Sequence, residues 1–337
     1  MDRVFKKTAV IGAGAWGTAL ALTAAYSGDP VVLWTYLEKE AAQIRETRLS
    51  LCPVEGAVPL PDNVLVTSDW ADVAGADLVI VVVPSVVMRR VARSLAEAGL
   101  AENAVIMSCS KGIEKDSNLF MSQLLETELH CPVGVLSGPN HAENVVLQKP
   151  SLTLVGFENP ETAAAVQHRL STPFMRIYTT TDVIGMQCGG AMKNVYALAC
   201  GICAGLELGD NALAAVATRG LAEMTRLGIA CGGHMDTFMG LSGVGDLMVT
   251  CYSHHSRNQT AGRLIAKGTP ACECQQMIGQ VVEGIPNTLS VYQLARRKNV
   301  RTPIADAMYE IIYDGIAPQT VLNELMTREL REENVVL

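Results

Sequence analysis

The chain has 337 residues, which is long for one average domain, and 49% of them are hydrophobic, enough to bury two cores. The formal net charge of -8 at pH 7 argues against a nucleic-acid partner, because such partners are bound largely by clustered lysines and arginines. We therefore expect a globular protein of two domains. Any phosphate that it binds should belong to a small molecule.

The cysteine content indicates a reducing compartment. The N-terminal residues run into an apolar segment that is too brief for the core of a signal peptide. In a chain without an export signal, ten cysteines favour reduced thiols packed as small apolar side chains, so we expect a cytoplasmic protein. Cys200 and Cys203 form a CxxC pair, but no second pair at the spacing of a zinc site accompanies it, and no metal site is predicted.

The first half of the sequence alternates short apolar runs with segments of helical length, which is the pattern of a parallel sheet covered by helices. A helix is predicted at residues 160–170, between the last two strands. We predict a Rossmann-type α/β domain with a mostly parallel sheet over residues 1–181. The predicted strands are residues 8–11, 31–34, 64–67, 78–83, 104–108, 133–136, 152–155 and 175–178.

The second half, residues 182–337, is predicted to be an all-helical domain, because few alternating β-branched runs occur in it. Its apolar run 183–208 is long enough to cross a membrane, but it contains Lys193 and Glu207, so a buried helix is favoured over stable membrane insertion. The predicted helices are residues 183–208, 212–227, 288–297 and 303–310.

A glycine-rich pattern joins the first predicted strand to an alanine-rich helix. Gly12, Gly14 and Gly17 form G-x-G-x-x-G. In this pattern the first glycine allows a tight turn, the second lets a pyrophosphate approach, and the third allows close helix-to-strand packing. The helix N-terminus favours the anion. The pattern and its context predict dinucleotide binding, and a plain tight turn is the alternative.

The end of the second predicted strand normally separates NAD from NADP enzymes, through an acid or an arginine. Here the strand is followed by Thr35 and Tyr36, which are neither. Glu38 comes slightly later and could either reach the ribose or simply begin the next helix. The sequence therefore predicts NAD or NADP without a choice between them.

Lys193 lies in the long apolar run, one turn after Gly189 and Gly190. Glycines in mid-helix cost about 1 kcal/mol each relative to alanine, so they need a reason such as the close approach of a substrate or cofactor. Burial would lower the pKa of the lysine and suit it to proton exchange near neutral pH. From spacing alone, catalysis and a lysine that snorkels to the surface are equally supported.

Three further segments carry candidate polar groups. Lys111 follows a predicted strand, at the edge where parallel strands face their ligands, although a surface lysine fits as well. Asp246 stands in a glycine-rich apolar segment, where it could orient a lysine or be an ordinary turn or N-cap residue. Ser256 as a helix cap and Arg257 beside it could form a phosphate cradle, or only a capped helix with a solvated arginine.

Taken together, these motifs resemble those of NAD(P)-dependent glycerol-3-phosphate dehydrogenases, and most closely the bacterial enzymes. The resemblance extends over almost the whole chain. It implies a reversible NAD(P)H-dependent reduction of dihydroxyacetone phosphate, a small phosphorylated substrate, to sn-glycerol 3-phosphate, which supplies glycerophospholipid synthesis. It leaves a homodimer open as the oligomeric state. The matching motifs begin, in order, at Gly12, Ser110, Leu136, Gly190, Gly243, Thr250, Ser256 and Val282.

The resemblance also implies roles for individual residues. Lys193 would donate or accept the proton, and Lys111 and Asp246 would complete the polar cluster around it. Tyr36 stands where many bacterial members have an arginine suited to the 2′-phosphate of NADP, so we expect either cofactor to be used. Asn140 replaces a commoner serine. The expected substrate contacts are Lys111, Gly138, Asn140, Lys193, Asn194, Asp246, Thr250, Ser256, Arg257 and Asn258. The expected cofactor contacts are Gly12, Gly14, Ala15, Trp16, Gly17, Tyr36, Lys111, Ala142, Arg257, Val281 and Glu283.

Two other functions are compatible with these residues. β-Hydroxyacid dehydrogenases also join a Rossmann domain to a helical domain with a Lys-Asn pair, but their substrates carry a carboxylate. A non-catalytic nucleotide sensor would bind the dinucleotide without transferring a hydride.

Overall fold

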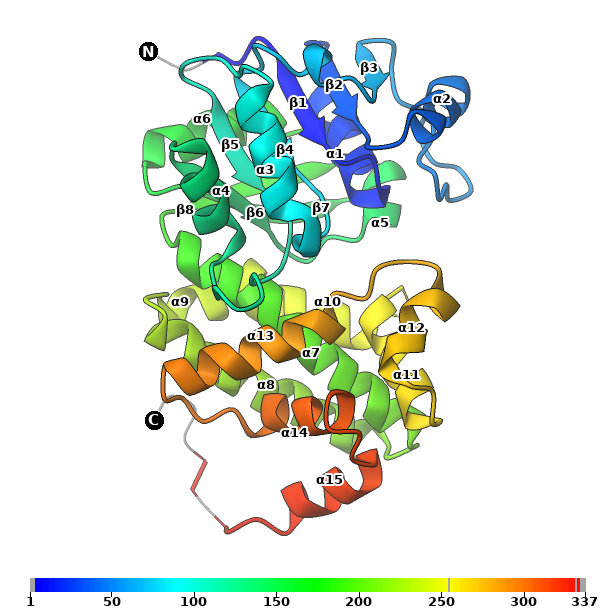
Figure 1. Ribbon diagram of the computed structural model, residues 1–337, viewed down its shortest axis with the longest axis vertical. Coiled ribbons are helices and arrows are strands. Elements are labelled where there is room, and N and C mark those ends of the chain that lie inside the picture. The colour runs from blue at the N-terminus through cyan, green and yellow to red at the C-terminus, as the bar shows by residue number, and fades with distance from the viewer. Residues whose placement is uncertain (1–3, 254, 331, 334–337) are drawn as a thin grey trace. The chain divides into compact units, whose positions relative to one another are not determined.

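The computed structural model describes residues 4–253, 255–330 and 332–333, and the chain forms two compact units (Figure 1). The first unit comprises Met1–Ser110 and Met121–Val183, and the second comprises Lys111–Phe120 and Ile184–Leu337. The domain boundary between residues 181 and 182 stays a prediction. The segment Lys111–Phe120 groups with the second unit, so Lys111 belongs to the helical part of the protein.

The first unit is built on an eight-stranded sheet in the order β3-β2-β1-β4-β5-β6-β7-β8. All neighbouring strands are parallel except β6 and β7, so the predicted mostly parallel sheet is confirmed. β4 ends two residues earlier than expected. The strands are β1 (Thr8–Ile11), β2 (Val31–Trp34), β3 (Val64–Thr67), β4 (Leu78–Val81), β5 (Val105–Ser108), β6 (Val133–Ser137), β7 (Ser151–Gly156) and β8 (Met175–Thr180).

Helices pack on the sheet because its central strands are apolar on both faces and need covering on both. The predicted helix at residues 160–170 is confirmed, and Asn159 caps it by accepting hydrogen bonds from the backbone N–H groups of Glu161 and Thr162. The helices of this unit are α1 (Ala15–Ala25), α2 (Glu38–Thr47), α3 (Met88–Glu97), α4 (Met121–Leu129), α5 (Ala142–Val146) and α6 (Pro160–Leu170), with short 3-10 turns η1 (Trp70–Asp72) and η2 (Ser85–Val87).

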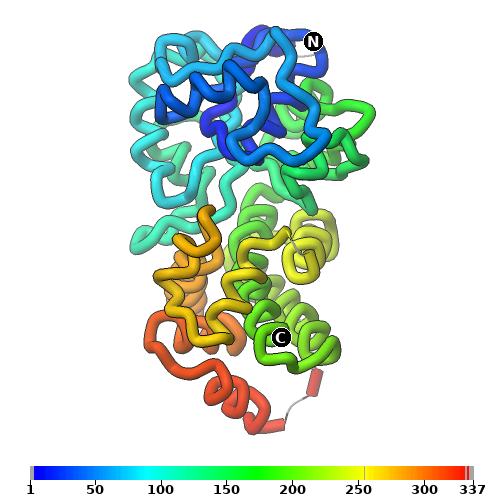
Figure 2. Tube along the Cα trace, turned by 90° about the vertical axis from the view of Figure 1, so that its right-hand side faces the viewer, coloured from blue at the N-terminus to red at the C-terminus, as the bar shows by residue number. Residues whose placement is uncertain are grey.

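The regular elements among the described residues of the second unit are helices joined by loops (Figure 2), and an isolated bridge pairs Ile113 with Phe120. The predicted all-helical second part is confirmed, although its first helix ends at Gly205 and not at residue 208. The elements are α7 (Val183–Gly205), α8 (Asp210–Ala230), α9 (Met235–Phe238), the π-helical turn η3 (Leu241–Gly245), α10 (Asp246–Tyr252), α11 (Arg257–Ala266), α12 (Ala271–Ile278), α13 (Gly284–Arg297), α14 (Pro303–Ile312) and α15 (Pro318–Met326).

Helix α7 runs through the core of the second unit, as expected for a buried apolar helix (Figure 1). Hydrogen bonds tie it to three other helices: Asn194 bonds to α11, Tyr196 to α8, and the backbone of Ala191 to α13. Among the described residues, no helix combines the length and the hydropathy needed to span a membrane. All ten cysteines are free thiols and most are buried, which fits their predicted use as small apolar side chains.

Candidate active site

The glycine loop between β1 and α1 has the geometry that a pyrophosphate needs. Gly12 has φ 114°, and a Cβ there would lie 2.8 Å from the carbonyl oxygen of Val82. A Cβ on Gly17 would lie 1.7 Å from the carbonyl oxygen of Gly12, so both positions require glycine. A Cβ on Gly14 would meet nothing within 4 Å. The backbone at the N-terminus of α1 is therefore open to an anion, and the first turn of α1 carries no acidic side chain.

The end of β2 lies directly beside this loop. The backbone N–H of Gly12 donates to the carbonyl oxygen of Trp34 at 2.9 Å, as parallel pairing of β1 and β2 requires. Two residues further, Tyr36 projects into solvent with 66% of its surface exposed. Tyr36 thus lies just beyond the carboxyl end of β2, at the edge of the sheet where parallel strands of such folds form their ligand crevice.

Glu38 begins α2 and is held by neighbouring side chains. It pairs with Arg45 and accepts a hydrogen bond from the Ser68 hydroxyl at 2.7 Å. The bonds from Ser68 and Arg45 lower the pKa of this carboxyl. Of the two expectations for Glu38, the structure supports a first-turn acid of the next helix.

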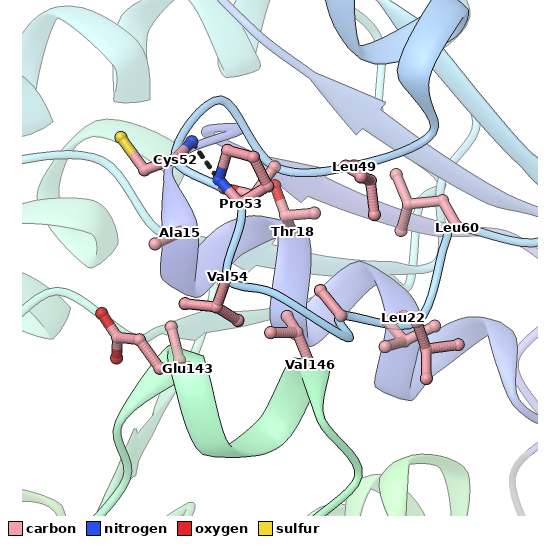
Figure 3. Close-up of a pocket in the computed structure, with 14 residues that line it drawn as sticks. Ala15, Thr18, Leu22, Leu49, Cys52, Pro53, Val54, Leu60, Glu143 and Val146 are labelled. Atoms are coloured by element: carbon pink, nitrogen blue, oxygen red, sulfur yellow. Dashed lines mark hydrogen bonds between the residues drawn. The ribbon is translucent and has the colours of Figure 1, made fainter.

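A small, mostly apolar pocket brings two expected cofactor contacts together (Figure 3). The pocket lies between α1, α5 and the loop of residues 48–60, and its lining includes Ala15 and Ala142. Trp16 packs against the core of the first unit. The loop and α5 therefore form one surface with the start of α1.

Two expected substrate contacts lie between β6 and β7 of the same unit. A Cβ on Gly138 would lie 3.1 Å from the Cα of Thr153, so glycine lets the chain pass close to β7. Asn140 donates from Nδ2 to the carbonyl oxygen of Leu152 at 2.9 Å. Its Oδ1 is buried and accepts no hydrogen bond within the described part of the chain.

The second unit contains a compact charged cluster around Asp246, which is fully buried. The Nζ of Lys111 lies 2.6 Å from one carboxylate oxygen of Asp246, and Lys193 is paired with the other. Lys193 also donates to the hydroxyl of Thr250 at 2.7 Å, and that hydroxyl donates to the backbone carbonyl of Asp246. The structure thus brings together four of the expected site residues, which are separated by up to 139 positions in the sequence.

Glycines allow this cluster to form. A Cβ on Gly189 would lie 2.3 Å from the carbonyl oxygen of Ser242, so glycine lets the π-helical turn η3 pack against α7. This contact places the start of α10, and with it Asp246, against Lys193. The sequence suggested a substrate or cofactor as the reason for Gly189, whereas its neighbour is the backbone of η3.

Burial sets the proton affinity of Lys193, whose exposed surface is only 7%. Loss of solvation lowers the pKa of its ammonium group to about 7, with a smaller lowering from the charge of Lys111, and Asp246 opposes both. A lysine that snorkels to the surface is therefore excluded. Near neutral pH, Lys193 can either donate or accept a proton.

The remaining expected substrate contacts surround the start of α11. Ser256 caps this helix by accepting a hydrogen bond from the backbone N–H of Gln259 at 3.2 Å, as expected. Arg257 donates to the carbonyl oxygen of Val281 at 3.0 Å, which links two expected cofactor contacts. Glu283 immediately precedes α13.

Asn194 and Asn258 are joined to each other across α7 and α11. Asn258 donates to the Oδ1 of Asn194 and accepts from the backbone N–H of Gly284, both at 2.9 Å. These amides therefore fix the spacing of three helices around the cluster.

Two buried polar residues of the second unit were not singled out from the sequence. Asn287 donates to the carbonyl oxygens of Lys111, at 3.3 Å, and Ala191, at 3.1 Å, and so connects the backbone of Lys111 to α7. Glu223 accepts from the backbone N–H of Ile304 at 2.7 Å and from the Tyr196 hydroxyl. Glu223 is a charged residue on a mostly apolar helix face, which is the signal that could have identified it, whereas Asn287 lies among other buried polar residues and carries no such signal.

Comparison with known proteins decides the family. Residues 7–163 match the family profile described as the N-terminus of NAD-dependent glycerol-3-phosphate dehydrogenase, and residues 182–323 match the profile of its C-terminus. The chain belongs to the NAD-dependent glycerol-3-phosphate dehydrogenase family. The resemblance predicted from the motifs is confirmed.

Individual members of the family match over nearly their full length. The chain is 40% identical to glycerol-3-phosphate dehydrogenase [NAD(P)+] of Halalkalibacterium halodurans, over 97% of this chain and 96% of that protein. Its identity to the enzyme of the same name from Bacillus velezensis is 42%, over 96% and 94%. The crystal structure of glycerol-3-phosphate dehydrogenase from Coxiella burnetii superposes with a TM-score of 0.90 and 34% identity, covering 96% of this chain and 99% of that one.

Proposed function

We propose that this chain catalyses the reversible NAD(P)H-dependent reduction of dihydroxyacetone phosphate to sn-glycerol 3-phosphate. The observation that carries the proposal is the buried Lys193 with a pKa of about 7, in a family named for this substrate and cofactor. The nicotinamide, when bound, supplies the hydride to the carbonyl carbon of the substrate. The residues of the chain supply the proton and hold the substrate.

Lys193 would act as the general acid for the reduction. As the carbonyl oxygen gains negative charge, the ammonium group donates a proton to it and becomes a neutral amine, and the product is the secondary alcohol. In the opposite direction the neutral amine accepts the alcohol proton. Asp246 and Thr250 hold the Nζ of Lys193 in place, and Asp246 stabilises the charged form.

The phosphate of the substrate would be held at the start of α11. The cap residue Ser256 and the guanidinium of Arg257 stand at a helix N-terminus, where backbone N–H groups and the helix dipole favour an anion. Asn194 and Asn258 would contact the same substrate from α7 and α11.

The proposed cellular role is the supply of glycerol phosphate for glycerophospholipid synthesis. We further propose that the enzyme is cytoplasmic, which its ten free cysteines support. A homodimer stays a prediction.

Steady-state kinetics tests the proposed function directly. Purified protein is mixed with NADH or NADPH and with dihydroxyacetone phosphate, short 2-keto acids or short 3-keto acids, and loss of the reduced nicotinamide absorbance is followed. We expect dihydroxyacetone phosphate to give the highest kcat/KM. Faster turnover of a keto acid would indicate a β-hydroxyacid dehydrogenase, and nucleotide binding without turnover of any substrate would indicate a sensor.

A further inference from the structure

Tyr36 and Arg90 come together in the first unit, although they lie on different elements. The guanidinium carbon of Arg90, in α3, lies 5.1 Å from the centre of the Tyr36 ring, just beyond the end of β2. We propose that Arg90, positioned by Tyr36, binds the 2′-phosphate of NADP. This inference depends on the proposed function in one respect, which is that the protein must bind a dinucleotide.

The location is suited to the adenosine ribose. The glycine loop and the end of β2 are joined by the hydrogen bond from Gly12 to Trp34, so a pyrophosphate at the loop brings its ribose to this strand end. A Cβ on Gly12 would touch the carbonyl oxygen of Val82, directly after β4. Because β4 leads into α3, the sheet order places the segment carrying Arg90 next to the same loop.

The acids closest in sequence to Tyr36 are engaged elsewhere. Glu38 is paired with Arg45 and Ser68, and Glu40 accepts a hydrogen bond from the Thr35 hydroxyl at 2.6 Å. NAD enzymes use an acid here to bind both ribose hydroxyls, and an unengaged carboxylate would repel a 2′-phosphate. Arg45 compensates the charge of Glu38, and the carboxylate of Glu40 is engaged by Thr35, so neither acid is held ready to bind the two ribose hydroxyls as in an NAD enzyme.

Stacking leaves the hydrogen-bonding groups of Arg90 available. A cation over an aromatic ring interacts through the face of the guanidinium, whereas its five N–H groups point outwards in the plane and match phosphate oxygens. The ring also restrains a long exposed side chain, which reduces the entropy lost on binding. Arg90 thereby supplies a cation at this strand end, where position 36 itself is the uncharged Tyr36.

The other two arginines of α3 differ in their surroundings. Arg89 and Arg93 both pair with Glu128, the latter at 3.0 Å. Within the described residues, Arg90 makes no ion pair of this kind, so its charge is not neutralised. Arg93 is consequently a matched control, because its replacement removes the same charge from the same helix away from Tyr36.

Two nucleotides that differ only in the 2′-phosphate test the proposal. Binding of 2′,5′-ADP and of 5′-ADP is measured by calorimetry for the wild type and for Arg90→Gln and Arg93→Gln. We expect Arg90→Gln to weaken 2′,5′-ADP binding about tenfold, the loss of one charge-assisted contact, without changing 5′-ADP binding. Arg93→Gln should bind both nucleotides as the wild type does. Equal changes for both nucleotides, or none for 2′,5′-ADP, in Arg90→Gln would overturn the proposal.

Replacements of Tyr36 test the positioning role of its ring. Tyr36→Phe keeps the ring and should keep the wild-type preference for 2′,5′-ADP, whereas Tyr36→Ala should lose part of it. If Tyr36→Ala binds 2′,5′-ADP as tightly as Tyr36→Phe, the ring does not position Arg90. These measurements need no turnover, so failure of the wild type to reduce dihydroxyacetone phosphate would refute the proposed function without affecting the nucleotide result.

Discussion

Lys193 and Asp246 form a buried ion pair that is linked to a second lysine, Lys111, through the other carboxylate oxygen. One carboxylate therefore faces two ammonium groups. Burial lowers the pKa of Lys193 to about 7, the positive charge of Lys111 contributes to the decrease, and Asp246 opposes it. The cluster holds a lysine that changes protonation state near neutral pH.

Truncation of Lys193 tests the proton transfer. Lys193→Ala should lower kcat by at least about 100-fold, the usual contribution of a positioned acid or base, while nucleotide binding is retained. Steady-state rates and a fluorescence titration with NADPH measure the two effects. Lys267→Ala, which removes an exposed lysine of the same unit, should behave as the wild type. Turnover of Lys193→Ala at the wild-type rate would exclude the proposed role.

The pH dependence of the reaction follows from the protonation state of Lys193. Reduction needs the ammonium form, so kcat for reduction should fall as the pH rises through about 7, and kcat for oxidation should rise over the same range. In Asp246→Asn the charge that favours the ammonium form is lost. Both profiles should then shift towards lower pH. If the pH profiles of wild type and Asp246→Asn coincide, Asp246 does not raise the pKa of Lys193.

Local features were predictable from the sequence because neighbouring residues determine them. The glycine loop follows from Gly12, Gly14 and Gly17 in one short stretch, and Ser256 was expected to cap a helix from its own neighbours. The strands of the parallel sheet were found because burial on both faces makes each a continuous apolar run.

Features that depend on distant residues could not be predicted from local spacing, and the cluster of Lys193, Lys111 and Asp246 was expected only from the resemblance. Spacing alone left Lys193 undecided between catalysis and the surface, because its burial depends on η3 and α10, some fifty positions later. The reason for Gly189 was likewise a backbone segment distant in sequence. Nothing local to Arg90 predicts its contact with Tyr36, since only the sheet order brings α3 to the end of β2.

Gly189 tests how the cluster is assembled. In Gly189→Ala the new methyl group would overlap the carbonyl oxygen of Ser242, so η3 must move away from α7 and carry Asp246 with it. We expect the free energy of unfolding to fall by about 1 to 3 kcal/mol and kcat to fall as well. Chemical denaturation and steady-state kinetics measure these changes. Gly240→Ala is the control, because a Cβ there would make only ordinary contacts at 3.5 Å.

Glu223 should make stability depend on pH below neutrality. Burial raises the pKa of its carboxyl to about 7, so between the unfolded value of 4.5 and about 7 the folded state holds a proton that the unfolded state has lost. Its contribution to stability is therefore complete below pH 4.5 and is lost as the pH rises through 7. The difference in unfolding free energy between Glu223→Gln and wild type should therefore change in favour of the variant by about 1 to 3 kcal/mol from pH 5 to pH 8. Urea denaturation at both pH values measures this change. Glu97→Gln, at an exposed acid, should show no such gain, and equal behaviour of the two variants would contradict the assignment.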